Sequence, residues 1–521
     1  PRGTTATVGS VTAVRMSVHR HQGRVDAWAV RDALAELRRA SVGDPAGADV
    51  SVWLDSSDES GISVFADATG PLAYTVEHRV GRGSTLSTGE ELTGSLFDSV
   101  DVLLSRRPLV DSGAALPFDF RPGFLGYIGY EVKAETGGQA AHLAPRPDAW
   151  LLFADRAVVI DHRNNTAYAL ALHTEAERLQ QEAWLHEMAT LVIPSAQERE
   201  EPRERPALAA SDLAVAQAGR HSPETYRHLV RRAQRAIRSG ETYEVCLTNE
   251  VTWPDRVDAA STYRAMRDIS PVPHAAWLEC GGFSVLSASP ERFVALSAQG
   301  QVRAEPIKGT RARDPDVERD RAVALELAGD AKERAENLMI VDLLRNDLHR
   351  VCRAGSVEVP EMFAVRTWST VHQLVSTITG QLAPGLRAAD VLRSCFPGGS
   401  MTGAPKVRTM EILDALEGGA RGIYSGAIGW LGVNGAMDTS IVIRSVVLGP
   451  VDSEGRSEAV FGVGGAITAL SDPDQEYMET LVKARGVAAA LGSRLASPTR
   501  CVSRPGPAPP HTPRGSARSS K

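Results

Sequence analysis

Lysine is rare in this chain, and most of its lysines lie in short motifs of the C-terminal half. Only six of the 57 basic residues are lysine, and four of these lie in such motifs, at Lys308, Lys332, Lys406 and Lys483. A lysine can lose a proton and act as a nucleophile, or present a compact charge, both of which an arginine does poorly. These lysines are therefore the first candidates for catalysis or binding.

Lys308 is the strongest candidate for a nucleophile. It follows the alternating residues 302–305, which predict a strand. Pro306 and Gly309 predict irregular backbone on both sides of the amine. The alternative is an ordinary lysine on a solvated surface.

Two pairs of glutamates have the spacing that places both carboxylates on one face of a helix. Glu333 and Glu336 form the first pair, and Glu476 and Glu479 form the second. Paired carboxylates repel each other unless a cation lies nearby, and Mg²⁺ takes oxygen ligands of this kind. The spacing indicates a magnesium site, with two ordinary solvated helix faces as the alternative.

A glycine-rich loop at residues 396–408 enters a predicted helix through Pro405. Its backbone N–H groups, together with Ser400, Thr402 and Lys406, predict an anion cradle. The loop lacks the Gly-Lys-Ser/Thr ending of a phosphate-binding P-loop, so a carboxylate is as good a ligand as a phosphate.

Other polar and small residues are candidates for substrate contacts. Arg444 lies in a predicted strand at residues 438–447, where it either pairs with a buried acid or clamps a substrate carboxylate. Gly464 and Gly465 allow the backbone to approach a ligand closely. Glu291 lies at a break between two predicted strands, where it is either solvated or directed into a cleft.

The elements that position these residues follow from capping and hydrophobic spacing. Helices are predicted at residues 175–191, 222–240 and 317–352, and strands at 52–57, 150–154, 242–248, 283–289 and 292–297. The last two strands are expected to pair around Glu291. In the strand at 242–248, Glu244 is expected on the face opposite Tyr243 and Val245.

The chain is expected to divide into parts of unequal length. Residues 12–195 form an N-terminal region of mixed strands and helices, and residues 222–491 form a densely patterned second domain. Between them, residues 196–221 are rich in charge and Pro and predict an exposed connector. The Pro-rich residues 492–521 cannot bury a core and predict a disordered tail.

Bulk composition limits the classes of function. A chain of 521 residues with 43% hydrophobic content can bury one large core or two. Its net charge of −7 gives no basic footprint, so we expect no nucleic-acid partner. It has no apolar run of about 18 residues and no charged-then-apolar leader, which predicts neither a membrane span nor a signal peptide. The first residue is Pro1 rather than Met, so we expect a processed product or the later part of a longer polypeptide.

The cysteines predict a reducing compartment. Five cysteines, an odd number, form no paired spacing of the zinc or redox kind. Reduced thiols and a cytoplasmic location are therefore expected.

Five motifs, in this order, resemble those of the chorismate-utilising enzymes. They are Ser289–Phe293, Pro306–Thr310, Ala335–Asp347, Gly403–Lys406 and Glu476–Glu479. The resemblance is strong over about residues 222–490 and weaker in the N-terminal part, at residues 54–57 and 126–131. It is closest to the component I family of aminodeoxychorismate synthases.

Certain positions separate the branches of this superfamily. The resemblance implies that anthranilate synthases have alanine at the position of Lys308 and histidine at that of Asn337. Relatives that add water to chorismate carry a lysine base where this chain has Glu244. His372 is offset by one position from the His-Leu-Val-Ser of many relatives, so the resemblance does not carry a catalytic role onto it.

The resemblance also implies roles for the site residues. Glu336 and Glu479 match magnesium ligands, with Glu333 and Glu476 behind them. The positions that match substrate contacts are Tyr424, Arg444, Gly464, Gly465 and Lys483, with Ser400 and Thr402 of the loop.

The implied reaction is an amino transfer to chorismate, of the aminotransferase class. Lys308 would attack C2 with allylic loss of the C4 hydroxyl, Glu291 would protonate that hydroxyl, and ammonia would then add at C4 and expel the lysine. For this attack we expect the pKa of Lys308 to fall below its ordinary value, through burial and nearby Mg²⁺. The product would be 4-amino-4-deoxychorismate, the precursor of 4-aminobenzoate in folate biosynthesis.

The resemblance implies an α+β fold, a large and mostly antiparallel two-sheet β-sandwich flanked by helices. The N-terminal part would belong to the same sandwich, and the site would lie in a cleft.

None of the five cysteines stands in the Gly-x-Cys-x-Gly setting of a glutaminase nucleophile. We therefore expect a glutamine amidotransferase subunit or fused domain to supply ammonia. The alternatives are an anthranilate synthase component I and a catalytically silent chorismate-binding subunit.

Overall fold

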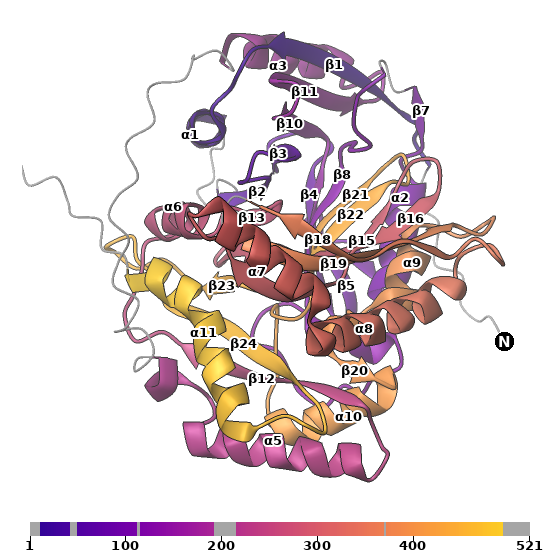
Figure 1. Ribbon diagram of the computed structural model, residues 1–521. Coiled ribbons are helices and arrows are strands. Elements are labelled where there is room, and N and C mark those ends of the chain that lie inside the picture. The colour runs from indigo at the N-terminus through magenta and orange to yellow at the C-terminus, as the bar shows by residue number, and fades with distance from the viewer. Residues whose placement is uncertain (1–10, 42–48, 112–114, 192–214, 369–370, 493–521) are drawn as a thin grey trace, which may run out of the picture.

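The computed structural model describes residues 11–41, 49–111, 115–191, 215–368 and 371–492. Within them the chain forms two large β-sheets that pack against each other, with helices on the outside (Figure 1). All strand pairs are antiparallel except β1 and β7. The predicted α+β sandwich is confirmed.

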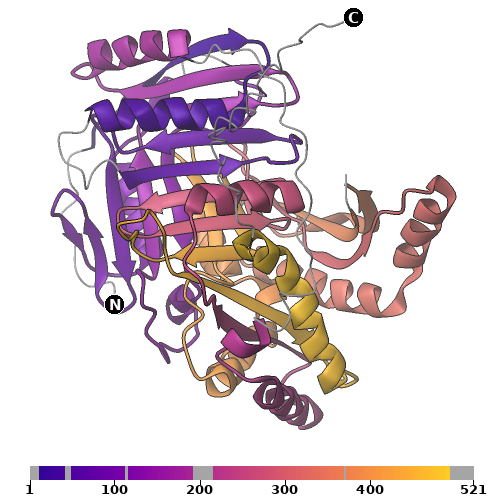
Figure 2. The same ribbon diagram turned by 90° about the vertical axis from the view of Figure 1, so that its left-hand side faces the viewer.

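The first sheet has twelve strands and contains residues from both ends of the chain. In order across the sheet they are β20 (Gly403–Ala404), β12 (Glu244–Thr252), β24 (Ala459–Ile467), β23 (Ser445–Leu448), β14 (Ser284–Ser289), β13 (His274–Cys280), β2 (Val50–Asp55), β3 (Ile62–Asp67), β10 (Arg156–Asp161), β11 (Thr166–His173), β1 (Val14–Gln22) and β7 (Leu109–Asp111). Figure 2 shows this order as one stack, from the indigo N-terminal strands to the later strands below.

The second sheet combines the two halves of the chain in the same way. In order its strands are β17 (Ile307–Ala312), β19 (Val371–Gln381), β16 (Gln301–Ala304), β15 (Arg292–Leu296), β22 (Met437–Ile441), β21 (Ala427–Gly432), β8 (Gly123–Ile128), β9 (Ala149–Ala154), β4 (Tyr74–Arg79), β5 (Gly83–Leu86) and β6 (Glu91–Leu92), and β18 (Glu358–Thr367) pairs with β19. Because β2 pairs with β13 and β8 with β21, the N-terminal region shares both sheets with the C-terminal part.

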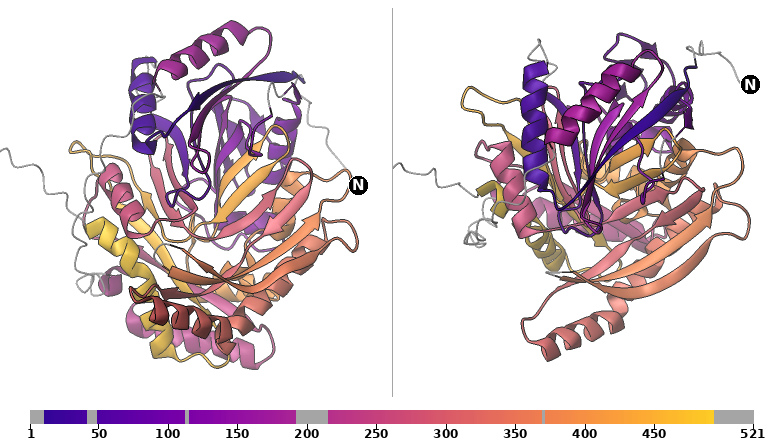
Figure 3. Two further views of the ribbon diagram at one scale, coloured as in Figure 1. Left: turned by 45° about the horizontal axis from the view of Figure 1, so that its top comes forward. Right: turned by 90° about the horizontal axis from the view of Figure 1, so that it is seen from above.

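The helices surround this sandwich. They are α1 (Ala27–Ser41), α2 (Leu96–Ser105), the 3₁₀ helix η2 (Tyr130–Glu135), α3 (Arg178–Leu191), α5 (Pro223–Arg238), α6 (Ala259–Ile269), α7 (Val317–Gly329), α8 (Ala331–His349), α9 (Ala388–Cys395), the 3₁₀ helix η3 (Gly399–Met401), α10 (Lys406–Glu417) and α11 (Pro473–Gly492). Figure 3 shows α1 and α3 together on the outer side of the N-terminal strands. No helix of the described ranges is long and apolar enough to cross a membrane.

The first sheet is buried on both faces, and its side chains alternate between two cores. Val52 and Leu278 lie in the core between the sheets, whereas Trp53 and Trp277 lie in a second core under the helices. This follows from the two-residue period of a strand, which sends successive side chains to opposite faces. The outer helices α5, α6 and α11 complete the second core.

Several predicted elements are confirmed. The helix predicted at residues 222–240 is α5, and the Ser222 side chain caps it by accepting a hydrogen bond from the Thr225 N–H. The strand predicted at 150–154 is β9, and that at 52–57 is β2 with an earlier end. The helix predicted at 175–191 begins later, at Arg178. Most of the predicted connector and tail lie outside the described residues.

One predicted helix and one predicted strand are each interrupted in the structure. The helix predicted at 317–352 is two helices, because the Asp330 carboxylate caps α8 by accepting hydrogen bonds from the N–H groups of Lys332 and Glu333. The strand predicted at 438–447 is also interrupted. It forms β22 in one sheet and β23 in the other, and Arg444 between them has a φ of 52°.

The strands β14 and β15 do not pair, contrary to the prediction. β14 belongs to the first sheet and β15 to the second, so the chain passes from one sheet to the other at Glu291. It passes back between β22 and β23, at Arg444. These two crossings lie side by side: the Ile441 N–H donates to the Glu291 carbonyl at 3.0 Å, and the Ala288 N–H donates to the Arg444 carbonyl at 3.1 Å. The fold thereby brings Glu291 and Arg444 together.

Candidate active site

Lys308 lies on β17 of the second sheet and reaches toward the first sheet. A β-bulge follows it at Gly309, whose φ is 77°. A Cβ atom at Gly309 would lie only 2.8 Å from Leu327 Cδ1, so the bulge requires glycine. The Lys308 side chain is 14% exposed, and its Nζ lies 3.4 Å from Glu244 Oε1 on β12 and 3.9 Å from Glu336 Oε2 on α8.

In the chain by itself, the pKa of Lys308 is raised rather than lowered, whereas the expected lowering includes nearby Mg²⁺ and stays a prediction. Burial does lower this pKa, but the nearby carboxylates of Glu244 and Glu336 outweigh it and raise the pKa above its ordinary value. The amine is therefore protonated here and stabilised by its acidic neighbours. A nucleophilic role requires a group that takes its proton.

Glu244 has the geometry of such a proton acceptor. It is buried on the inward face of β12, as its predicted position opposite Tyr243 requires. Its Oε1 faces Lys308, and its Oε2 is buried with no hydrogen-bond partner among the described residues. Sequence analysis predicted the strand face of Glu244 and noted the lysine that it replaces in relatives, but it did not predict the contact with Lys308.

Glu291 occupies the crossing between the sheets on the other side of Lys308. Its carboxylate accepts hydrogen bonds from the Ser400 hydroxyl and the Ile307 N–H. Burial raises its pKa to about 7, although the positive charge of Lys308 acts in the opposite direction. A carboxyl group with this pKa exchanges a proton near neutral pH, as a general acid must.

The acid pairs of α8 and α11 converge on the same place. A Cβ atom at Gly465 would lie 3.5 Å from Glu476 Oε2, 3.8 Å from Lys483 Nζ and 3.9 Å from Glu479 Oε1. The absence of a side chain at Gly465 therefore leaves room for these groups. Glu336 joins them from α8, because Lys332 lies 3.8 Å from its Oε1 and also interacts with both glutamates of α11.

These carboxylates differ in how well they are compensated. Burial raises the pKa of Glu336 and of Glu476. The nearby lysines therefore do not fully compensate these two carboxylates for the water that they lose on burial. Burial also acts on Glu479, but its contact of 2.7 Å with Lys483 lowers its pKa overall. Glu333 faces Arg311 at 3.3 Å.

The donor set fits a hard cation such as Mg²⁺. Within the described ranges, no three His, Cys, Asp or Glu side chains lie close enough together to hold a metal ion directly. However, Mg²⁺ takes only one or two protein carboxylates and completes its coordination with water and substrate oxygens. Glu336, Glu476 and Glu479 supply oxygen donors, and the raised pKa values of the first two indicate that an added cation would be favourable.

Arg444 presents its guanidinium without an acidic partner. Its Nη1 donates to the Ser270 hydroxyl at 3.2 Å, and no carboxylate of the described residues lies within ion-pair distance. Burial lowers its pKa, and Glu291 is the charged group that opposes this. Of the two alternatives from sequence, the structure favours a clamp for a substrate carboxylate over a pair with a core acid.

Small residues on β24 make room for the other predicted substrate contacts. A Cβ at Gly462 would lie 2.2 Å from Tyr424 Cγ, so the Tyr424 ring lies against bare backbone. A Cβ at Gly464 would lie 2.5 Å from the Leu247 carbonyl. Lys483 donates to the Gly464 carbonyl at 3.1 Å. Sequence reasoning identified Gly464 and Gly465 but missed Gly462.

The glycine-rich loop serves the site through Ser400 rather than as a full anion cradle. The Thr402 hydroxyl is buried and donates to the Gly398 carbonyl at 3.2 Å. Lys406 is directed elsewhere, because its Nζ binds Asp347 Oδ2 at 2.6 Å and the Cys395 carbonyl at 2.7 Å. The prediction that Lys406 lines the cradle was therefore wrong.

Two other polar residues lie in structural networks. His372 binds Asp320 at 2.9 Å and Thr367 at 2.8 Å, which explains its burial without a catalytic role. Arg421, which sequence reasoning missed, donates to the carbonyls of Met401 and Cys246 at 2.6 and 2.8 Å. It thereby ties the loop to β12. The sequence feature that could have identified Arg421 is its position within the glycine-rich residues 418–426.

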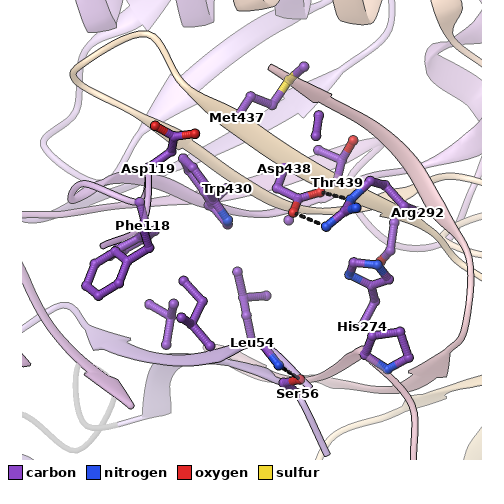
Figure 4. Close-up of a pocket in the computed structure, with 18 of the residues that line it drawn as sticks. Leu54, Ser56, Phe118, Asp119, His274, Arg292, Trp430, Met437, Asp438 and Thr439 are labelled. Atoms are coloured by element: carbon purple, nitrogen blue, oxygen red, sulfur yellow. Dashed lines mark hydrogen bonds and ion pairs between the residues drawn. The ribbon is translucent and has the colours of Figure 1, made fainter. Parts of the chain in front are cut away.

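A larger cavity lies elsewhere between the sheets (Figure 4). Its volume is about 540 Å³, and its walls include Leu54, Phe118, Trp430 and the ion pair of Arg292 with Asp438. None of the predicted site residues, all of which the structure describes, lines this cavity. The candidate active site is therefore the cluster around Lys308.

Known proteins resemble this chain over most of its length. The family model described as chorismate binding enzyme matches residues 71–489. An aminodeoxychorismate synthase of Streptomyces pristinaespiralis is 46% identical over 468 residues, which cover 87% of this chain and 63% of that protein. The aminodeoxychorismate synthase component 1 of Klebsiella aerogenes is 36% identical over 433 residues, covering 81% of this chain and 89% of that protein.

Solved structures show the same fold. The anthranilate synthase component I of Streptococcus pneumoniae TIGR4 has a TM-score of 0.67 at 26% identity, covering 82% of this chain and 92% of that one. The isochorismate synthase MenF of Escherichia coli has a TM-score of 0.62 at 16% identity, covering 94% and 96%. The chain spans less than two thirds of the length of the Streptomyces relatives, 63% and 65%.

Proposed function

Because this chain belongs to the chorismate-binding enzyme family, we propose that it is component I of an aminodeoxychorismate synthase. It would convert chorismate and ammonia to 4-amino-4-deoxychorismate, the precursor of 4-aminobenzoate for folate. The observation that carries this proposal is Lys308, a buried primary amine with Glu244 on one side and Glu291 on the other. A buried amine close to two carboxyl groups suits covalent catalysis.

The first requirement is a neutral Lys308 amine. Glu244 lies at 3.4 Å from the amine and has an acceptor atom without another partner in the described structure. We assign it the role of taking the Lys308 proton. The neutral amine then attacks C2 of chorismate.

The second requirement is departure of the C4 hydroxyl. Glu291 is largely protonated below about pH 7 and gives its proton to that hydroxyl, which leaves as water as the C2–N bond forms. The Ser400 hydroxyl and the Ile307 N–H hold the resulting carboxylate in place. Ammonia then adds at C4 and expels the Lys308 amine, which completes the amino transfer.

The remaining residues bind and orient the substrate. Arg444 takes the carboxylate of the enolpyruvyl arm, and Tyr424 and the glycines of β24 shape the floor under the ring. Glu336 and Glu479, with Glu333 and Glu476 behind them, would hold Mg²⁺, which when bound neutralises the ring carboxylate and withdraws electrons from the ring. Lys483 adds positive charge beside Glu479.

The ammonia is proposed to come from glutamine through a partner. No cysteine of this chain has the sequence setting of a glutaminase nucleophile. The partner would be a glutamine amidotransferase subunit or a fused domain.

The proposed function is tested by supplying the purified chain with chorismate, Mg²⁺ and a millimolar ammonium salt at mildly alkaline pH. Chromatography should show 4-amino-4-deoxychorismate with the enolpyruvyl group retained. Glutamine in place of ammonium should give no product until a glutaminase subunit is added. Anthranilate and pyruvate would instead identify an anthranilate synthase, and absence of any turnover would identify a chorismate-binding subunit without catalysis.

A further inference from the structure

A second, very small cavity lies against Glu291. Its volume is about 10 Å³, roughly the space that one water molecule needs. It lies between the crossing at Glu291, helix α8 and the glycine-rich loop. The residues that line it are Glu291, Arg292, Phe293, Pro306, Ile340, Leu344, Gly398, Gly399, Ser400 and Ile441.

The side chains that line this cavity are mostly apolar, with few groups that can form hydrogen bonds. Most of its side chains are apolar, among them Phe293, Ile340 and Ile441, which are 3%, 1% and 2% exposed. The Arg292 guanidinium also lines the cavity but is held by Asp438 and Glu305. The Glu291 carboxylate and the Ser400 hydroxyl, which bind each other, therefore supply the hydrogen-bonding groups left for a ligand. A small neutral molecule with one or two N–H or O–H bonds matches this lining, whereas a cation would lose much of its hydration among apolar groups.

Gly398 of the loop lies against the walls of this cavity. Gly398 has a φ of −56°, which any residue can adopt, so its backbone does not require glycine. A Cβ there would instead lie 2.5 Å from Ile441 Cδ1 and 3.6 Å from the Phe293 ring, both of which line the cavity. The missing side chain at Gly398 is therefore explained by the close packing of Ile441 and Phe293, two side chains that line the cavity.

We propose that this cavity binds ammonia, the second substrate, and presents it to C4 of the ring. This inference rests on the proposed function and names a site for the nucleophile. Ammonia has nearly the size of water. Glu291 would accept one of its N–H bonds, and the apolar walls would leave the nitrogen lone pair free to attack.

The position beside Glu291 also balances the protons of the reaction. Loss of the C4 hydroxyl as water leaves Glu291 as a carboxylate and Lys308 bonded to C2 as a secondary ammonium. Ammonia then forms the C4–N bond while the C2–N bond breaks, and Lys308 departs as a neutral amine. The new ammonium at C4 gives one proton to Glu291, which restores the carboxylic acid and leaves 4-amino-4-deoxychorismate.

Four variants test the cavity. Gly398→Ala places a methyl group against the Ile441 and Phe293 walls and narrows it, Ile441→Val removes the Cδ1 methyl and widens it, and the double variant Gly398→Ala/Ile441→Val exchanges one methyl group for the other and keeps its volume close to the original. Gly329→Ala, where a Cβ would meet no atom within 4 Å, is the control for a glycine-to-alanine change. The measurements are the KM for ammonia at fixed pH, the KM for chorismate, and the rate of the covalent Lys308 adduct with chorismate alone.

We expect Gly398→Ala to raise the KM for ammonia roughly tenfold or more, the effect of one methyl group in a fitted pocket, and the double variant to return it toward the value of the unaltered chain. The KM for chorismate and the adduct rate should stay within about twofold of the unaltered chain, because neither step involves ammonia. Ile441→Val should raise the use of methylamine relative to ammonia. Gly329→Ala should change none of these values.

An unchanged KM for ammonia in Gly398→Ala, or equal rises in both KM values in that variant, would mean that the cavity holds a structural water or is a packing gap. Either result overturns the ammonia site while leaving the proposed function in place. Failure of the unaltered chain to form any 4-aminated product would overturn both.

Discussion

Two charged clusters, one built on arginine and one on lysine, come within three residues of each other in sequence at Glu305 and Lys308 and behave in opposite ways. The arginine cluster consists of Arg292, Arg303, Arg366, Glu305 and Asp438, and the lysine cluster of Lys308, Lys332, Lys483, Glu244, Glu336, Glu476 and Glu479. In the arginine cluster Arg292 binds both oxygens of Asp438, at 2.9 and 3.0 Å, and Arg366 binds Glu305 at 2.7 Å. In the lysine cluster Lys308 stays 3.4 and 3.9 Å from its two carboxylates.

The neighbouring glutamates show what this difference means electrostatically. Although burial acts to raise it, the pKa of Glu305 is lowered to about 2 by Arg292, Arg366 and Arg303. The pKa of Glu291, next to Arg292 in sequence, is instead raised to about 7 by burial. Planar guanidinium groups saturate a carboxylate and fix it, whereas Lys308 contacts its carboxylates loosely and leaves the Glu244 Oε2 acceptor open for a ligand or a proton. The arginine cluster therefore stabilises the fold, and the lysine cluster is available for chemistry.

The largest effect is expected at the proposed metal site. Glu336→Gln or Glu479→Gln removes one charge with little change in volume, so turnover should fall by at least about a hundredfold while the melting temperature stays close to that of the unaltered chain. Removal of divalent cations with EDTA should abolish turnover, and Mg²⁺ should restore it. Asp342→Asn, on the exposed face of the same helix α8, is the matched control and should retain near-normal rates. Full activity in metal-free buffer would show that these glutamates are ordinary helix residues.

Glu291→Gln should separate activity from stability. Without a transferable proton, formation of the Lys308 adduct should slow by about a hundredfold. In the unaltered chain the adduct rate should fall as the pH rises through about 7, because Glu291 must be protonated.

The free energy of unfolding of the Glu291→Gln variant should rise, whereas its adduct rate falls. Since the pKa of Glu291 is raised from 4.5 to about 7, the folded chain holds an extra proton between these values and loses stability as the pH rises through them. At pH 8 the Glu291→Gln variant should therefore be more stable, by up to about 3 kcal/mol. Denaturant unfolding at pH 5 and pH 8 measures this. A variant less stable than the unaltered chain at pH 8 would contradict the burial of an uncompensated carboxylate.

Glu305→Gln should lower the stability of the fold and have the smallest effect on catalysis. The pKa of Glu305 is lowered from 4.5 to about 2, so its ion pairs stabilise the fold above pH 4.5 and are lost as the pH falls toward 2. At pH 7 the variant should lose about 3 kcal/mol of unfolding free energy, while the adduct rate of the folded fraction stays within a few-fold. Unfolding and adduct kinetics on one preparation compare the two quantities. An adduct rate that falls as far as in Glu291→Gln would erase the distinction between the clusters.

The parts of the site that sequence could predict are those carried by local pattern or by motif. The scarcity of lysine identified Lys308, helical spacing identified Glu336 and Glu479, and a capping serine fixed the start of α5. The sheet crossings at Glu291 and Arg444 could not be predicted, because a two-residue period marks a strand but not the sheet that it joins.

Long-range contacts account for the other features that sequence could not predict. Lys406 was assigned to the loop because of its neighbours in sequence, whereas its partner Asp347 lies 59 residues away. The sign of the Lys308 pKa shift depends on Glu244 and Glu336, which reach the amine from another sheet and from a helix. Such shifts depend on charges brought together only by the fold.

Covalent capture of chorismate on Lys308 tests the central claim most directly. The chain is incubated with chorismate and Mg²⁺ without ammonia, and intact-mass spectrometry followed by peptide mapping locates any added mass. We predict an adduct on the peptide that carries Lys308, none on the peptide that carries Lys332, and loss of the adduct in Lys308→Ala, which should still bind chorismate. Lys308→Arg keeps the charge but cannot deprotonate usefully, and should form neither adduct nor product. Near-normal 4-amination by Lys308→Arg would show that the lysine acts only through its charge, and would contradict the covalent mechanism.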